Sequence, residues 1–184
     1  MIMKSSTIYF VLVQPGDAAF IHALRINKDY NQYLSYVDDE LINQQKWLIE
    51  YKKREECKQE YYYIIHRIAD DVPIGTVRIY DFLEDKNSFS WGSWILNKHK
   101  TRYSALESAL LVYDFAFLVL SFKQCHMVIR KQNIKVLEFH KKFGVEITAE
   151  TETDYIGNYS IEKYLLIKED IKKVIEKNNN IQAV

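Results

Sequence analysis

Hydrophobic and polar positions follow the spacing of a strand in some stretches of the chain and that of a helix in others. Runs of β-branched and aromatic residues predict strands, and apolar residues three or four positions apart predict helices. The predicted order is strand, two helices, three strands, helix, strand, helix, two strands, helix. The first eleven ranges are 7–13, 18–26, 38–51, 61–68, 73–82, 88–96, 103–120, 124–129, 134–143, 146–155 and 159–167, and the last helix carries Ile167, Ile171, Val174 and Ile175.

Two of the predicted helices differ in how much of their surface is apolar. In the second helix, Leu41, Leu48 and Ile49 are expected to share one buried face, with Trp47 beside it. The longest predicted helix is apolar on most sides, so we expect the protein to bury it.

Two glycines mark predicted ends of elements. Gly144 predicts the end of the helix before it, because glycine accepts the left-handed conformation of a helix cap. Gly157 and Asn158 are predicted to form the turn of a closing hairpin.

The composition describes an ordered globular protein. The chain has 184 residues, of which 48% are hydrophobic and 14% aromatic. We therefore expect a single domain over residues 1–184, with a frayed tail from about Asn178. The 25 basic and 25 acidic residues balance, which gives no electrostatic reason to expect nucleic acid as a partner.

The apolar stretches are too short or too interrupted to cross a membrane. Residues 8–13 form one short run, and Asp114 interrupts the run over residues 109–122. We expect a cytoplasmic protein with no targeting segment and no membrane partner. Cys57 and Cys125 are then two free thiols. The five histidines lack metal-ligand spacing, so we expect no metal site.

Four segments of the sequence carry a resemblance to a known family. Residues 73–77 (PIGTV), 94–96 (WIL), 105–109 (ALESA) and 133–144, which end in a histidine, two lysines, a phenylalanine and a glycine, occur in a fixed order. In this order and spacing they resemble the GNAT N-acetyltransferase superfamily over nearly the whole chain. The resemblance implies an α+β GNAT fold, with a mixed, mostly antiparallel twisted sheet flanked by helices.

The same resemblance implies acetyl-CoA as co-substrate. Backbone groups of residues 94–96 would pair with the pantetheine arm, and the start of the helix at 103–120 would bind the pyrophosphate. The implied cofactor-binding residues are Trp94, Ile95, Leu96, Lys100, Arg102, Tyr103, Ser104, Ala105, Leu106 and Asn133. The basic residues before the helix are also open to interpretation as a solvated turn. Unlike the family's loop, residues 101–106 contain no glycine.

Asn133 and His140 are seven residues apart, so a helix places them on one stripe. By resemblance, His140 is the catalytic residue: it lies beside the thioester sulfur and protonates the leaving thiolate, as imidazolium or through water. A packed histidine at His140 and a helix cap at Asn133 are the structural alternatives.

Three further residues are candidates for a general base, although a water chain could also serve. Glu107 is expected on a helix surface, Asp81 in a turn, and His126 half-buried on a strand.

Residues 24–27 (LRIN) and 42–51 resemble one bacterial branch of the superfamily. That branch includes enzymes for nucleotide-linked amino sugars of surface glycans and ribosomal-protein alanine acetyltransferases, and residues 140–143 (HKKF) are more similar to the sugar enzymes. An acceptor pocket is expected from Arg25, Asn27, Tyr80 and Trp91, with Trp47 as a further candidate. Core packing is the alternative for both tryptophans.

The predicted function is therefore acetyl transfer to a primary amine of a small molecule, specifically a nucleotide-linked amino sugar. One alternative is an acetyltransferase for protein N-termini, which would need an open groove. Another is an acyl-CoA-binding module without catalysis, suggested by the glycine-free loop. A homodimer through a sheet edge is compatible with the resemblance.

Overall fold

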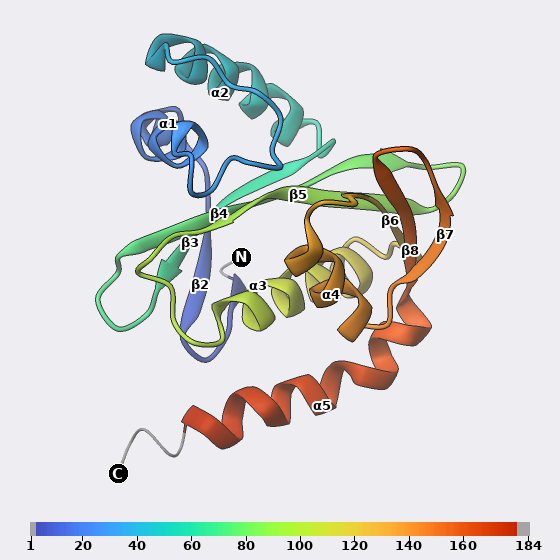
Figure 1. Ribbon diagram of the computed structural model, residues 1–184. Coiled ribbons are helices and arrows are strands. Elements are labelled where there is room, and N and C mark those ends of the chain that lie inside the picture. Colours follow the sequence, from blue (N-terminus) through green and yellow to red (C-terminus); the bar gives the residue numbers. More distant parts are fainter. Residues whose placement is uncertain (1–2, 180–184) are drawn as a thin grey trace. The chain divides into compact units, whose positions relative to one another are not determined.

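The computed structural model describes residues 3–179 (Figure 1). The strands are β1 Met3–Lys4, β2 Ile8–Leu12, β3 Tyr61–Arg67, β4 Pro73–Leu83, β5 Ser88–Leu96, β6 Gln124–Arg130, β7 Glu146–Glu150 and β8 Asp154–Ser160. The helices are α1 Ala18–Ile26, α2 Leu41–Glu56, α3 Ser104–Tyr113, α4 Ile134–Lys142 and α5 Ile161–Asn179. A 3₁₀ turn, Pro15–Asp17, precedes α1, and a π-helical segment, Asp114–Val119, continues α3.

The strands form an eight-stranded sheet in the order β1-β2-β3-β4-β5-β6-β8-β7. Strands β5 and β6 pair in parallel, through Ser88 with Gln124 and Phe89 with Cys125. The other pairs with a described register, such as β6 with β8, run antiparallel. The predicted α+β fold and element order are confirmed, with the short strand β1 added at the start.

The described chain divides into two compact units that are not consecutive in sequence. Of the described residues, unit 1 comprises 3–81 and 91–108, and unit 2 comprises 82–90 and 109–179. Strand β5 and helix α3 each contribute residues to both units. The single domain expected over residues 1–184 stays a prediction.

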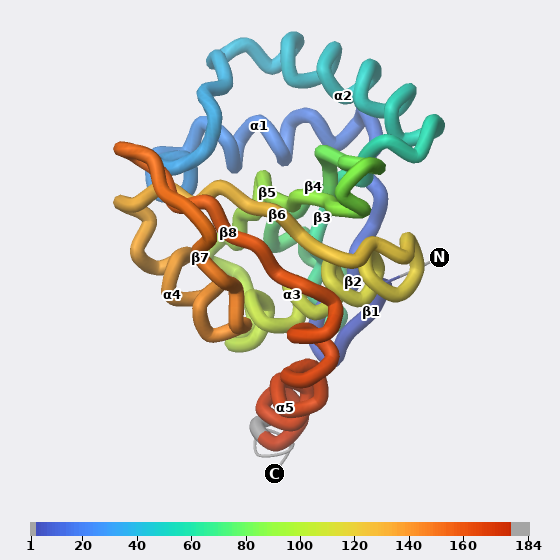
Figure 2. The backbone as a smooth tube through the Cα atoms, turned by 90° about the vertical axis from the view of Figure 1, so that its right-hand side faces the viewer, coloured from blue at the N-terminus to red at the C-terminus, as the bar shows by residue number. Residues whose placement is uncertain are grey.

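Unit 1 buries a hydrophobic cluster between its first two helices and its strands. Helices α1 and α2 lie together on one face of the strands, and the first turns of α3 lie on the other (Figures 1 and 2). The cluster contains Val13, Ala18, Ile21, Leu48, Tyr51, Tyr62 and Ile64. These side chains come from loop, helix and strand, so their burial ties the two helices to β3.

The buried face of α2 differs from the predicted one. Leu41 and Ile49 are exposed, whereas Gln44, Leu48 and Tyr51 are buried at intervals of four and three residues. Hydrophobicity alone misplaced the face, because Tyr51 and the polar Gln44 provide the inward stripe.

Helix α2 also starts later and ends later than predicted. The Asp38 carboxylate accepts hydrogen bonds from the Glu40 N–H at 2.9 Å and from Asn43 Nδ2 at 3.0 Å. These bonds hold residues 38–40 in a turn rather than a helix. At the other end, the chain leaves the helix through Lys58, whose φ of 57° is left-handed.

Unit 2 is built around an aromatic cluster, which consists of Phe89, Tyr113, Phe117, Phe143, Tyr159 and Tyr164. Tyr113 is fully buried, and its ring centroid lies 4.9 Å from that of Tyr159 and 5.5 Å from that of Tyr164. As predicted, the long helix turns apolar side chains inward on most sides. Its last part, however, is the π-helical segment rather than a continuous α-helix.

The predicted closing hairpin is wrong in its turn and in its second strand. Gly157 lies inside β8, and residues 161–167, predicted as strand, belong to α5. An added Cβ at Gly157 would lie 3.0 Å from Val145 Cγ1 and 3.1 Å from Met127 Cγ. The glycine therefore serves close packing within the sheet rather than a turn.

Two further local expectations, at Gly144 and at the two cysteines, agree with the structure. Gly144 ends α4 with a left-handed φ of 84°, and Cys57 and Cys125 are free. No helix within residues 3–179 is long and apolar enough to cross a membrane. The frayed tail expected from about Asn178 falls mostly on residues 180–184, which lie outside the described part of the chain.

Candidate functional site

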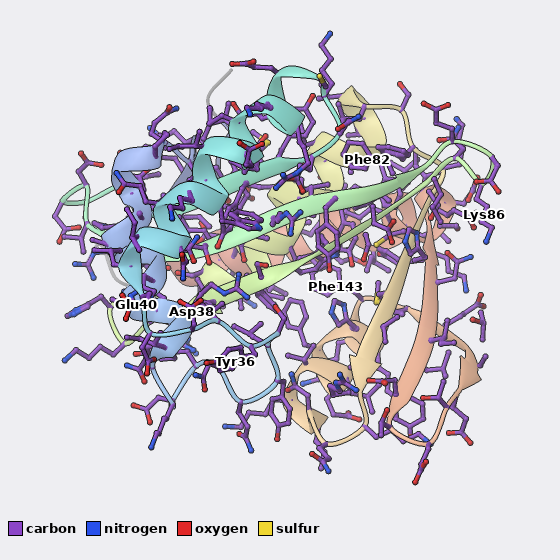
Figure 3. All side chains as sticks on the ribbon, turned by 90° about the horizontal axis from the view of Figure 1, so that it is seen from above. Tyr36, Asp38, Glu40, Phe82, Lys86 and Phe143 are labelled. Atoms are coloured by element: carbon purple, nitrogen blue, oxygen red, sulfur yellow. The ribbon has the colours of Figure 1, made fainter. Side chains whose placement is uncertain are left out.

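A polar pocket of about 340 Å³ lies within unit 1. It is formed by α1, the loop before α2, the first turns of α2, and strands β4 and β5. Its lining residues are Arg25, Ser35, Tyr36, Val37, Asp38, Asn43, Gln44, Trp47, Arg78 and Ser93. Figure 3 shows Tyr36 and Asp38 on the loop that leads into α2. Two guanidinium groups and one carboxylate therefore face this space.

Arg25, a predicted acceptor residue, is part of this pocket. Its Nη2 donates to Ser35 O at 3.2 Å and to Ser35 Oγ at 2.8 Å, while its buried Nε has no hydrogen-bond partner among the described residues. Burial lowers the pKa of the Arg25 guanidinium, and the nearby Arg78 acts in the same direction. An anionic group in the pocket would relieve both effects.

Arg78, which the sequence did not single out, is the second arginine of the pocket. Its guanidinium forms a salt bridge with Glu60 and lies 5.1 Å from the ring centroid of Trp47 and 4.7 Å from that of Tyr80. A recognisable signal was an arginine between Val77 and Ile79, in the middle of a largely buried strand. Tyr80, a predicted acceptor residue, thus contacts a pocket residue.

Trp47 and Tyr36 are the aromatic residues of the pocket, and they differ in how much of each ring is available. Trp47 packs against Tyr51 and Tyr62, and two guanidiniums lie over its ring. Tyr36 is 89% exposed. Of the two, only Tyr36 offers a ring face that a ligand could cover.

Like Tyr80, two further predicted acceptor residues lie outside the pocket lining. Asn27 is exposed, and its Oδ1 accepts a hydrogen bond from the Asp29 N–H at 2.8 Å, which shapes the turn after α1. Trp91 is buried, and its ring packs edge-on against Trp94 at 5.2 Å. Trp91 is therefore a core residue, which was the alternative to a role in the acceptor pocket.

The predicted cofactor strand follows the pocket directly along β5. Ser93, a pocket residue, has a left-handed φ of 45°, so the strand bends at the residue before Trp94. Trp94 Nε1 donates to Ser108 Oγ at 3.1 Å, Ile95 is buried and Leu96 is half-buried. The bend joins the polar pocket to the cofactor segment within unit 1.

Gly75, in the segment 73–77, has a direct role beside this strand. A side chain at this position would place its Cβ 2.0 Å from the carbonyl oxygen of Ile95. Glycine therefore allows the backbones of β4 and β5 to approach where the cofactor segment begins.

A basic turn leads from β5 to the start of α3. Lys98, His99, Lys100 and Arg102 are all exposed. A side chain from another strand orders the turn, because Arg67 Nη1 donates a hydrogen bond to the His99 carbonyl oxygen at 2.8 Å. Exposed cations immediately before a helix N-terminus form an arrangement that suits a phosphate group.

The start of α3 is fixed by side chains instead of by glycines. The Ser104 hydroxyl is buried and lies 2.7 Å from Thr101 Oγ1, which in turn lies 2.7 Å from Thr7 Oγ1. Glu107 Oε1 accepts from the Thr7 N–H at 2.7 Å. Hydroxyl groups and a carboxylate therefore hold the first turn, while Ala105 and Leu106 remain partly exposed there.

Glu107 corrects a prediction made from the sequence. We expected it on the helix surface, but it is fully buried and hydrogen-bonded to Thr7. A polar side chain in a helix turns inward when a tertiary partner satisfies it, and periodicity cannot reveal that partner. Its contacts assign it a structural task at the start of α3.

Asn133, a predicted cofactor-binding residue, and His140, the predicted catalytic residue, lie at the start and near the end of α4 in unit 2. Asn133 is the N-cap of α4, and its Oδ1 accepts from the Val136 N–H at 3.4 Å. His140, two turns later, is 7% exposed. Burial lowers the pKa of its imidazole to about 4, so the ring is neutral at pH 7.

The remaining base candidates are not part of the polar pocket. His126 is half-buried, as expected, and its Nδ1 lies 2.7 Å from Ser88 Oγ. Asp81 is exposed on β4 with a left-handed φ of 55°, rather than in a separate turn. Among residues 3–179, no group of three or more histidine, cysteine, aspartate or glutamate side chains could hold a metal ion.

Comparison with known proteins decides the family. The model of the acetyltransferase (GNAT) domain matches residues 8–146. The chain belongs to the GNAT acetyltransferase family. The resemblance inferred from the sequence motifs is therefore confirmed, and the protein is an N-acetyltransferase.

Individual relatives agree with this assignment. A solved structure of apo FdhC, described as a nucleotide-linked sugar GNAT, is 45% identical, covers 92% of this chain and 96% of its own, and has a TM-score of 0.86. The probable N-acetyltransferase YjcK of Bacillus subtilis (strain 168) is 29% identical over 152 residues, 76% of this chain and 84% of its own length.

More distant structures share the fold alone. The ribosomal-protein-S5-alanine acetyltransferase of Vibrio fischeri has a TM-score of 0.73 at 11% identity, covering 87% of this chain and 96% of its own. A spermidine/spermine N-acetyltransferase, SpeG of Vibrio cholerae, has a TM-score of 0.73 at 17% identity, covering 89% of this chain and 99% of its own.

Membership in the family implies that this acetyltransferase uses acetyl-CoA, and the residues of unit 1 fit that co-substrate. The ten-residue helix α3 offers first-turn N–H groups, beside which Ala105 carries only a methyl group. Lys100 and Arg102 add positive charge next to it. The Arg102 guanidinium lies over the ring of Tyr103 at 5.4 Å.

Proposed function

We propose that this acetyltransferase transfers an acetyl group to the primary amine of a nucleotide-linked amino sugar. The observation that carries the proposal is the pair of arginines, Arg25 and Arg78, in a pocket beside the cofactor segment of β5. A nucleotide-linked sugar carries a diphosphate, and guanidinium groups bind phosphate oxygens through paired hydrogen bonds. The 45% identity to a nucleotide-linked sugar GNAT supports the same acceptor class.

The charge of the pocket argues against cationic acceptors. A polyamine or a protein N-terminus is positively charged before reaction and would favour a pocket rich in carboxylates. Here Asp38 is the one carboxylate among the lining residues, and hydrogen bonds from Glu40 N–H and Asn43 already engage it. The acceptor expected from this arrangement is an anion that carries an amine.

The residues of the pocket would share the recognition of such an acceptor. Arg25 and Arg78 would hold the diphosphate, and the exposed ring of Tyr36 would cover the base. Trp47 would shape the pocket wall, since its own ring is already covered by guanidiniums. Ser93, at the bend of β5, would mark the end nearest the cofactor segment.

The chemical step needs little from the protein beyond positioning. Acetyl-CoA, when bound, supplies the acetyl group as a thioester. A free amine with a pKa of about 8 is partly deprotonated near neutral pH, so a water chain suffices to remove its proton. A backbone N–H of β5, within residues 94–96, would stabilise the oxyanion.

His140 remains our candidate for the proton delivered to the leaving sulfur. Because its pKa is about 4, the ring does not carry a standing positive charge at pH 7. A neutral imidazole donates at one nitrogen and accepts at the other, so it would pass a proton from water to the sulfur. The role proposed for His140 is therefore a relay, not an imidazolium acid.

Release of the free thiol from acetyl-CoA, measured against a panel of amines, tests the proposal. We expect turnover with amino sugars linked to a nucleoside diphosphate, and at least 100-fold lower kcat/KM with the same sugars lacking the nucleotide, as expected for about 3 kcal/mol of lost phosphate binding. Preferred turnover of spermidine or of peptides would overturn it. No turnover on any amine, despite acetyl-CoA binding, would favour a non-catalytic acyl-CoA-binding module.

The same assay examines His140. His140→Ala is expected to lower kcat while leaving the Kd for acetyl-CoA unchanged. Unchanged turnover would remove His140 from the catalytic residues. The cytoplasmic location and a role in surface glycan synthesis are part of the same proposal.

A further inference from the structure

Glu60 is a buried carboxylate that contacts the polar pocket without lining it. It is 3% exposed and lies between the end of α2 and the start of β3. A buried carboxylate is costly unless cations and hydrogen bonds compensate for its lost hydration. The partners that provide this compensation are two arginines, and one of them belongs to the pocket.

Both oxygens of Glu60 are engaged by guanidinium groups. Arg54 Nε donates to Oε1 at 2.7 Å, and Arg78 Nε donates to Oε2 at 2.8 Å. Arg78 Nη2 also donates to Oε2. Glu60 therefore holds Arg78 by one edge of its guanidinium and leaves Nη1 as the nitrogen that the carboxylate does not engage.

Aromatic rings fix the plane of the same guanidinium. The central carbon of Arg78 lies 5.1 Å from the ring centroid of Trp47 and 4.7 Å from that of Tyr80. Arg54 lies over the Trp47 ring at 5.3 Å. One edge bound by a carboxylate and two ring contacts leave the Arg78 head group little rotational freedom.

We infer that Glu60 is a positioning residue for acceptor binding, which presents Arg78 to the diphosphate of the acceptor in a fixed orientation. The inference rests on the proposed function. Glu60 would thus contribute to specificity for the acceptor without contacting the acceptor itself. Glu60 neutralises one of its two arginine partners, so the group of three keeps a positive charge that an anion can use.

Electrostatic attraction of the phosphate by Arg78 would not by itself require Glu60 to fix the orientation of the guanidinium. An arginine that is free to rotate also attracts phosphate, but it loses side-chain entropy when it binds. Holding Arg78 in place before binding reduces that cost. Replacing Glu60 with glutamine keeps the volume but puts an NH₂ donor against one of the two guanidiniums, so one of them must move away.

The test measures the Kd of the whole protein for uridine diphosphate and thymidine diphosphate by calorimetry, with acetyl-CoA binding as reference. Glu60→Gln is expected to weaken diphosphate binding about tenfold, which corresponds to loss of one charge-assisted hydrogen bond. The Kd for acetyl-CoA should stay within twofold. Glu60→Asp, which retains the charge on a shorter side chain, should recover part of the lost affinity.

Glu55→Gln is the matched control. Glu55 lies in the last turn of α2, five residues before Glu60, and its side chain is 11% exposed. It pairs with Lys52 and Tyr51 rather than with a pocket residue. It should bind both diphosphates like the wild type. A similar loss in Glu55→Gln and Glu60→Gln would show a general structural effect and overturn the inference.

Two other outcomes are distinguishable. Equal diphosphate affinity in wild type and Glu60→Gln would overturn the positioning role while leaving the proposed acceptor intact. No binding of either diphosphate by the wild type would overturn the proposed acceptor, and the positioning role with it. Should Glu60→Gln fail to fold, Arg78→Lys tests the same contact, and wild-type affinity in that variant would overturn the inference.

Discussion

Trp47 in unit 1 and Tyr113 in unit 2 both sit among aromatic rings, yet the rest of their surroundings differ. Tyr113 is surrounded by Phe117, Phe143, Tyr159 and other rings of the aromatic cluster. Trp47 packs on Tyr51 and Tyr62 but also faces two guanidiniums. The chain thus uses aromatic residues in unit 2 to exclude water and in unit 1 to orient charges at a pocket.

The same contrast appears in the ionisable groups. In unit 2, His140 is buried, and burial lowers the pKa of its imidazole to about 4, so the ring is neutral at pH 7. In unit 1, Glu60 is equally buried, but it has two cationic partners. The buried carboxylate beside the pocket is therefore paired with cations, whereas burial keeps the imidazole of His140 neutral.

The largest expected effect concerns the aromatic cluster of unit 2. Tyr113→Ala removes a fully buried ring from the centre of the aromatic cluster and should lower the free energy of unfolding by about 3–5 kcal/mol. Chemical denaturation, followed by tryptophan fluorescence, measures the change. A loss below about 1 kcal/mol would mean that the cluster tolerates a cavity and is not the main source of stability in unit 2.

The next effect concerns the buried histidine. The pKa of His140 is lowered to about 4 in the folded state, against about 6.5 when unfolded, so the unfolded state binds more protons between these values. Stability is complete above pH 6.5 and falls as the pH decreases. At pH 5 the loss should be roughly 2 kcal/mol, measured by denaturation at several pH values.

His140→Gln is the comparison variant for this pH dependence. It cannot titrate in this range, so its stability should change less between pH 7 and pH 5 than that of the wild type. Equal pH profiles for the two proteins would show that other groups account for the acid sensitivity and that His140 does not stay neutral by burial.

The smallest expected effect concerns the polar pocket of unit 1. Tyr36 is 89% exposed, so Tyr36→Ala should leave the free energy of unfolding within about 0.5 kcal/mol of wild type. It should nevertheless raise the KM for a nucleotide-linked acceptor about tenfold, since stacking on a base contributes roughly 1–3 kcal/mol. Tyr36→Phe, which keeps the ring, is the control and should behave like the wild type.

An unchanged KM in Tyr36→Ala would mean that the base of the acceptor does not contact this ring. Recognition of the acceptor within the pocket would then depend on Arg25 and Arg78 alone.

Much of the fold followed from local sequence. The ranges of α1 and β5 agree with the predicted ones, and Gly144 ends α4, because helix and strand periodicity and a glycine cap act over a few neighbouring residues. The segment 73–77 was one of four that together carried the resemblance to the family, and the close approach of Ile95 explains why a glycine stands at position 75. Such features depend on short stretches of chain.

The candidate site depended on contacts between distant parts of the chain. Arg25 was predicted for the pocket, but Arg78 and Tyr36 were not, because the loop before α2 and strand β4 meet only after folding. Glu107 was misplaced on the surface for the same reason, since its partner, Thr7, is 100 residues away.

The sequence by itself determined the order of elements, the family motifs and the residue types available for chemistry, because these depend on local periodicity and spacing. The tertiary structure alone decided which polar side chains are buried with partners and which face a pocket. Burial and pairing depend on groups far apart in sequence, and the free energy of a buried charge such as Glu60 is set by those groups.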